Sequence, residues 1–177
     1  MGLIAGILTL VSIFFPWYEL AGEIGNGPVY WKVYPLSQDY NELMKNFVFP
    51  QNWRAAGPPM PRVAIPIILA AIISVYSSLF VKKWLRRAFG LIISTFAILI
   101  CIGDFVQGWM LKIMLSGLPI PPGELNFQEF VVTAQWGPGI YVAGAALIFT
   151  GLSVGLEILK TVTLMLKEAA DSIKKMR

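Results

Sequence analysis

Four long apolar runs constrain the fold of this chain more than any other feature. They cover Met1–Trp17, Val63–Val81, Ala88–Trp109 and Gly139–Leu159. Each run is close to the ~20 residues that an α-helix needs to cross the ~30 Å hydrocarbon layer of a bilayer. Backbone polar groups in lipid must be paired within the spanning segment, and the runs lack the period-two alternation of barrel strands. The sequence therefore predicts an all-α membrane protein, with one domain over residues 1–177 built as a bundle of transmembrane helices.

The distribution of charge predicts how the bundle is oriented. Basic residues crowd the short link between the second and third runs and the segment after the fourth run, whereas the first loop (residues 18–62) has balanced charge. Because cytoplasmic segments are enriched in Lys and Arg, we expect a multi-pass protein of the cell membrane with both termini cytoplasmic. The first loop and the second loop (residues 110–138) are then outside. Anionic lipid head groups, rather than nucleic acid, are the predicted partners of Lys82, Lys83, Arg86, Arg87, Lys167, Lys174 and Lys175.

The first loop carries signals for a small β-structure. Residues 17–24 and 29–35 flank Gly25-Asn26-Gly27-Pro28, a strong turn signal, so we predict an extracellular β-hairpin. Asp39 fits the N-cap of a short helix that follows. The aromatic residues of this loop either pack as a cap over the bundle or form a surface that binds other membrane proteins. They are Trp31, Tyr34, Tyr40, Phe47 and Trp53.

Two helical patterns extend past their apolar runs. The third run predicts helix as far as Leu115, followed by a tight proline-rich loop. After the fourth run, residues 160–177 keep an apolar stripe at helical spacing opposite Lys160, Lys167 and Lys174. This amphipathic tail is expected either to lie on the inner leaflet or to pack against another tail helix.

Small residues recur on one face of several predicted helices. Such stripes let neighbouring helices approach closely, which drives packing in lipid. The interpretation is either a compact bundle within one chain or, for the G-x-x-x-G of Gly151 and Gly155, contact between copies. The packing residues predicted from the pattern are Gly90, Ser94, Ala97, Gly108, Gly144, Gly151 and Gly155.

Two acidic residues lie within or beside the predicted spans. Asp104 falls in the third span and needs a partner there, and Arg62 at the start of the second span can reach inward. We therefore predict an Arg62–Asp104 ion pair that acts as a structural staple. Glu157, three residues before Lys160, is expected to form an interfacial pair with it. An alternative is a small channel or transporter component that uses Asp104 and Glu157.

The composition argues against catalysis. The chain has no histidine and a single cysteine, Cys101, so it lacks the usual general base and any set of zinc or iron–sulfur ligands. No catalytic residue, metal or cofactor is predicted. The sequence therefore favours a non-catalytic scaffold or accessory subunit that acts by self-association, as a homo-oligomer, or by binding other membrane proteins.

The layout resembles the claudin-like four-helix superfamily, which includes claudins, peripheral myelin proteins and channel γ-subunits. The local echoes are Trp17 at the start of the first loop, Gly27-Pro28-Val29-Tyr30-Trp31 in the place of the family's Gly-Leu-Trp strand, Arg62 before the second span, and Trp136-Gly137-Pro138 before a glycine-rich fourth span. The family's paired loop cysteines are absent. The resemblance implies a β-sheet built by the first loop and lateral association with copies or with a larger membrane protein.

Overall fold

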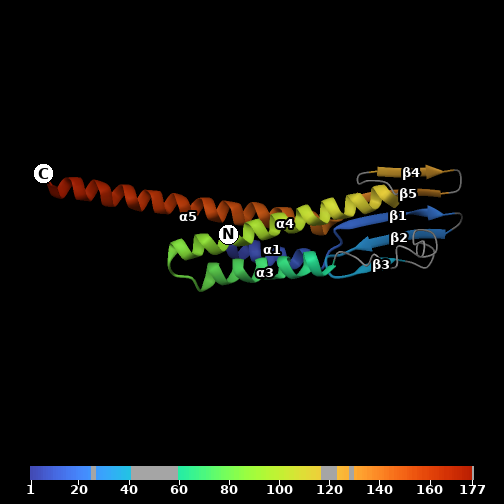
Figure 1. Cartoon of the computed structure of the whole chain (residues 1–177), viewed down its shortest axis with the longest axis horizontal. Coiled ribbons are helices and arrows are strands. Elements are labelled where there is room, and N and C mark those ends of the chain that lie inside the picture. The colour runs from blue at the N-terminus through green and yellow to red at the C-terminus, as the bar shows by residue number, and fades with distance from the viewer. Residues whose placement is uncertain (25–26, 41–59, 117–122, 128–129, 177) are drawn as a thin grey trace.

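The computed structural model describes residues 1–24, 27–40, 60–116, 123–127 and 130–176, and near some element ends it describes the backbone alone. The described part is mostly helical and carries one small antiparallel sheet (Figure 1). The helices are α1 (Gly2–Ser12), α3 (Met60–Leu79), α4 (Trp84–Ser116) and α5 (Pro138–Met176). The strands are β1 (Tyr18–Ile24), β2 (Gly27–Val33), β3 (Gln38–Tyr40), β4 (Gly123–Phe127) and β5 (Phe130–Trp136).

The helices form a closed ring in which each contacts two neighbours. α1 lies against α3 and α5, and α4 lies against the same two helices. Hydroxyl groups join the helices, because Ser74 Oγ donates to the Gly2 carbonyl and Ser94 Oγ to the Ala70 carbonyl, each at 2.8 Å. Gly6 lets α1 approach α3 closely, since a Cβ there would lie 2.6 Å from Val75 Cγ2. These contacts confirm a helical bundle held together by small residues and hydroxyls.

The first helix is shorter than predicted, because it ends at Ser12 rather than near Trp17. Pro16 disfavours helical geometry at the residue before it. The chain therefore leaves the helix through tighter turns, in which the Phe14 and Phe15 amides donate to the Val11 and Ser12 carbonyls. The Trp17 indole Nε1 also donates to the Ser12 carbonyl, at 3.0 Å. These bonds satisfy carbonyls that the end of a helix leaves free.

The hairpin predicted in the first loop is confirmed. β1 and β2 pair antiparallel from Tyr18 opposite Val33 to Ile24 opposite Gly27. β3 adds to the outer edge of β2, so the strand order is β3-β2-β1-β5-β4. The helix predicted to start at Asp39 is wrong at its first turn, because Asp39 and Tyr40 belong to β3, and its remaining residues lie outside the described part.

Beyond the predicted proline-rich loop, the second loop contains two strands that were not predicted from the sequence. It forms the hairpin of β4 and β5, and β5 pairs with β1 along the whole of β1, from Tyr18 opposite Trp136 to Ile24 opposite Phe130. The two loops therefore build one sheet at the end of the bundle that we call the sheet end (Figure 1). The opposite end, where the link of residues 80–83 joins α3 to α4, is called the link end.

The sheet packs its apolar face onto the helices. Tyr18, Leu20 and Trp31 point inward with at most 1% of their surfaces exposed, together with the helical Ile67 and Phe105. The opposite face is polar, and there Glu19 lies between Lys32 of β2 and Gln135 of β5, whose Nε2 donates to it at 2.9 Å. Burial raises the pKa of the Tyr18 phenol above its ordinary value, so this side chain stays neutral in the core.

Within the described ranges, two helices are long and apolar enough to cross a membrane, over Trp84–Gly108 and Pro138–Ile173. Only 28% of the most apolar stretch of each helix is buried inside the protein, so most residues there are at least partly exposed. The remaining apolar helical segments, Gly2–Ser12 and Val63–Leu79, are shorter. The predicted fourth span and the predicted tail form one unbroken helix, α5, which continues past the link end (Figure 1).

Candidate functional site

A charged cluster lies at the link end of the bundle. Glu157 of α5 is 8% exposed, and its Oε1 lies 3.5 Å from Arg87 Nη1 and 3.6 Å from Lys160 Nζ. Arg87 also donates to the Val81 carbonyl through Nε at 3.0 Å and Nη2 at 2.8 Å. One guanidinium therefore fixes the α3–α4 link and pairs with α5. The expected Glu157–Lys160 pair is confirmed.

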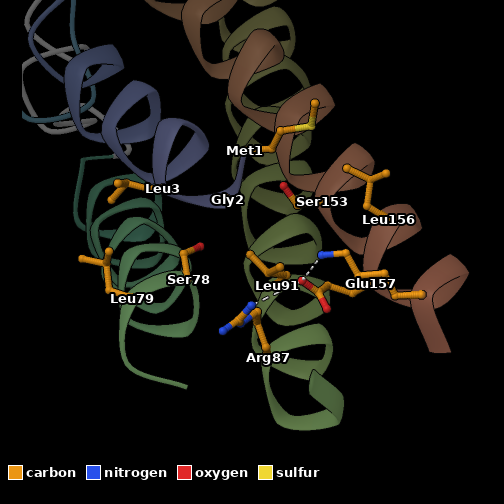
Figure 2. A pocket seen from close by; sticks show the side chains of 11 residues that line it. Met1, Gly2, Leu3, Ser78, Leu79, Arg87, Leu91, Ser153, Leu156 and Glu157 are labelled. Atoms are coloured by element: carbon orange, nitrogen blue, oxygen red, sulfur yellow. Dashed lines mark hydrogen bonds and ion pairs between the residues drawn. The ribbon is translucent and has the colours of Figure 1, made fainter. Parts of the chain in front are cut away.

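A pocket of about 310 Å³ opens beside this cluster (Figure 2). All four described helices contribute to its wall, with Gly2 from α1, Ser78 from α3, Leu91 from α4 and Ser153 from α5 among the lining residues. The two hydroxyls already donate to backbone carbonyls, Ser78 to Ser74 and Ser153 to Phe149. The charged side chains of the wall are therefore the main groups that could bind a polar ligand in the pocket.

The charges of the cluster limit what it can do chemically. Two cations face one carboxylate, which leaves an excess of positive charge at the mouth of the pocket. This excess of positive charge can bind an anionic group, for example that of an anionic lipid head group. Among the described residues, His, Cys, Asp and Glu form no group of three that could hold a metal ion. The cluster is thus suited to binding an anionic group and to fixing the helices relative to one another.

Replacing Arg87 with alanine is expected to lower the free energy of unfolding by about 1–2 kcal/mol, because the nearly buried Glu157 loses one of its cations and the link loses its anchor. Arg86→Ala is the matched control, since that neighbouring side chain is exposed. Equilibrium unfolding in mild detergent measures both changes. Equal stability of the two variants would contradict the anchoring role of Arg87.

The residues predicted to contact lipid head groups differ in how exposed they are. Lys82, Lys83, Arg86 and Lys167 are exposed, whereas Arg87 is half-buried and already paired. The side chains of Lys174 and Lys175 lie outside the described part. The pairing of Arg87 with Glu157 was missed by sequence reasoning, because residues 70 positions apart carry no local signal for contact.

The predicted Arg62–Asp104 staple stays a prediction. The backbone of Arg62 belongs to α3, but its side chain lies outside the described part. Asp104 is exposed on α4. An exposed carboxylate in this part of the helix still needs a partner if the helix is surrounded by lipid.

The predicted aromatic interaction surface needs one correction. Trp31 is 1% exposed, since it faces the helices from β2 and packs edge-to-face on Tyr18 with ring centroids 5.9 Å apart. It is therefore a core residue and not a surface anchor. Tyr34 is half-buried, and the side chains of Tyr40, Phe47 and Trp53 lie outside the described part.

The small residues that were predicted to pack the bundle divide into two groups. Gly90 faces the Ser77 hydroxyl, Ser94 is buried against α3, and Ala97 is half-buried, so these positions bear out close packing of α4. The prediction of packing within this chain is wrong for four glycines, because a Cβ on any of them would meet nothing within 4 Å. They are Gly108, Gly144, Gly151 and Gly155.

An apolar groove lies at Gly144, one of these open glycines, near the sheet end. It encloses about 690 Å³ and is lined by residues of α4, β5 and α5, among them Val106, Trp136, Tyr141, Gly144 and Ile148. The lining is mostly apolar, so the groove suits an apolar occupant, a lipid chain or another helix. No protein-family model matches this chain, and no curated protein matches it.

Proposed function

We propose that this protein is a four-pass membrane protein with both termini cytoplasmic and the sheet outside. The ring arrangement supports this, because α1 and α3 lie alongside the two longer helices and would enter the same hydrocarbon layer. The outward positions of the shorter helices are also apolar, with Ile7 49%, Leu69 51% and Ile72 54% exposed. Labelling of cysteines introduced at position 82 and on β2 from opposite sides of sealed vesicles would test the orientation.

The proposed function is that of a non-catalytic scaffold or accessory subunit that associates laterally with copies of itself or with a larger membrane complex. The observation that carries this proposal is the open glycine face of α5, formed by Gly144, Gly151 and Gly155. Within lipid, small residues promote association because they allow helix backbones to approach closely. A glycine face that no helix of the described part covers is available to a neighbouring protein.

The likeness to the claudin-like superfamily is part of the same proposal. A sheet built largely by the first loop above a bundle is the architecture that this likeness implies, and the strands β1 to β3 fit it. The channel alternative draws less support from the geometry of Glu157, because two cations already neutralise that carboxylate.

Counting subunits by photobleaching of the labelled protein at low density in liposomes tests lateral association. We expect more than one copy per spot, or a stable complex with a co-purifying membrane protein when the source membrane is used. Gly151→Phe and Gly155→Phe should dissociate the assembly, whereas Ile72→Phe on the exposed face of α3 should not. Ion flux abolished by Asp104→Asn, with only single copies present, would favour the channel alternative and overturn the scaffold.

A further inference from the structure

One face of α5 carries an unbroken apolar row from the groove to the tail. Its members alternate at spacings of four and three residues. They are Tyr141, Ala145, Ile148, Leu152, Gly155, Leu159, Val162, Leu166, Ala169 and Ile173. The members beyond the bundle are well exposed, with Leu159 at 63%, Leu166 at 66% and Ile173 at 57%. The tail members of the row, from Leu159 onward, are all exposed in the described part of the chain.

The tail part of this row is carried away from the other helices. α5 runs as a single helix to Met176, and the sequence after Gly155 contains neither glycine nor proline that would bend it. Residues 161–176 therefore extend about 24 Å further at 1.5 Å per residue, and Figure 1 shows this end projecting well beyond the α3–α4 link. In a membrane spanned by the bundle, the end of the row reaches water, where an exposed apolar row is unfavourable.

We propose that the tail of α5 pairs with the tail of a second copy of this chain as a parallel coiled coil. This pairing rests on the proposed lateral association. It specifies a second copy of the chain as the partner and the apolar row of the tail as the contacting surface. The repeat of three and four residues averages 3.5, which is the period that places one face of each helix at a left-handed two-helix seam. Leu159, Leu166 and Ile173 take one set of seam positions, and Val162 and Ala169 take the other.

The charges of the tail are arranged so that copies do not repel one another at the seam. The positions that flank the row on both sides are uncharged, namely Thr163, Met165, Ala170 and Ser172. Lys167 and Asp171 lie on the opposite, exposed face of the helix, away from the seam. Because every copy enters the membrane in the same orientation, the tails are held parallel and in register, which a coiled coil of this kind requires.

A tail that lies on the lipid surface is the competing arrangement. It would require α5 to bend sharply near the link end, and the described helix has no break there. The two arrangements differ in which residues meet their own counterpart. In a parallel coiled coil, residues of the apolar row face the same residues of the partner, whereas residues of the charged face lie far apart.

Disulfide cross-linking of the full-length protein in liposomes tests this difference. Cys101 is the single cysteine, so Cys101→Ser gives a background for one introduced cysteine at a time. Oxidation with copper phenanthroline should link copies that carry Leu166→Cys or Ile173→Cys. Leu164→Cys is the matched control, because Leu164 is the same residue type, 53% exposed, and lies on the charged face. Equal cross-linking at positions 164 and 166, or none at positions 166 and 173, would overturn the proposal.

A second pair of variants separates this inference from the proposed function. Leu166→Lys should abolish cross-linking through Ile173→Cys, and Leu164→Lys should leave it intact. If photobleaching still counts several copies while no tail position cross-links, lateral association stands and the coiled coil is wrong. If only single copies are found and no tail position cross-links, both fail.

Discussion

Replacing Trp17 with alanine is expected to lower the free energy of unfolding by about 3–5 kcal/mol, the range for large aromatic residues in a core. Trp17 is fully buried at the point where α1 meets the sheet. Its ring packs edge-to-face on Phe105 of α4 with ring centroids 5.1 Å apart, and its indole N–H donates a hydrogen bond to the Ser12 carbonyl. The substitution therefore removes packing and leaves a helix-end carbonyl without its side-chain donor.

Equilibrium unfolding in mild detergent, followed by far-ultraviolet circular dichroism, measures this loss. Trp84→Ala is the matched control, because Trp84 starts α4 at the link end and is 37% exposed. Trp17→Phe should retain part of the stability, since it keeps an aromatic ring but loses the indole donor. A loss for Trp17→Ala no larger than that for Trp84→Ala would show that the junction of helices and sheet does not depend on this residue.

Replacing Gly139 with alanine is expected to cost about 3 kcal/mol, at the upper end of the range for overpacking a core. Gly139 is the second residue of α5 and donates its amide to the Pro16 carbonyl at 2.8 Å. An added Cβ would lie 2.5 Å from the Phe15 carbonyl oxygen and 2.9 Å from that of Pro16. These are backbone atoms of the α1–β1 connection, so relief requires the connection itself to move.

The same glycine-to-alanine substitution elsewhere in α5 should raise the free energy of unfolding instead of lowering it. Gly144 lies in the same helix with nothing within 4 Å of an added Cβ, so Gly144→Ala should stabilise the helix by about 0.5–1 kcal/mol. The pair compares one chemical change at two positions of one helix by the same unfolding measurement. Equal effects of Gly139→Ala and Gly144→Ala on the free energy of unfolding would mean that the α1–β1 connection can move at little cost.

Local signals in the sequence were sufficient for much of the fold. The turn at residues 25–28 located the β1–β2 hairpin, and the absence of a breaker before Ser116 predicted the length of α4. Apolar periodicity past Leu159 predicted that the helix continues, and α5 does so to Met176. In each case neighbouring residues carry the information, because turns and helices are held by bonds between residues close in the chain.

Features that depend on distant residues were missed. The run Phe130-Val131-Val132-Thr133 has strand-forming residues, but β5 is recognisable as a strand only with β1 beside it. Arg87 and Glu157 likewise meet only because the ring of helices places α4 against α5. The sequence alone could not decide whether the α5 glycines pack within one chain or against another protein, because periodicity gives the face that small residues share and not the neighbour that the face meets.

The pairing of β1 with β5 has a consequence for how the protein is made. Tyr18 emerges from the ribosome long before Trp136, its partner across the sheet. Until that moment one edge of β1 presents unpaired amides and carbonyls, which are a template for pairing with other chains. The nascent protein therefore needs this edge shielded through the synthesis of α3 and α4, and a stalled or truncated product that ends before β5 should be prone to aggregation and degradation.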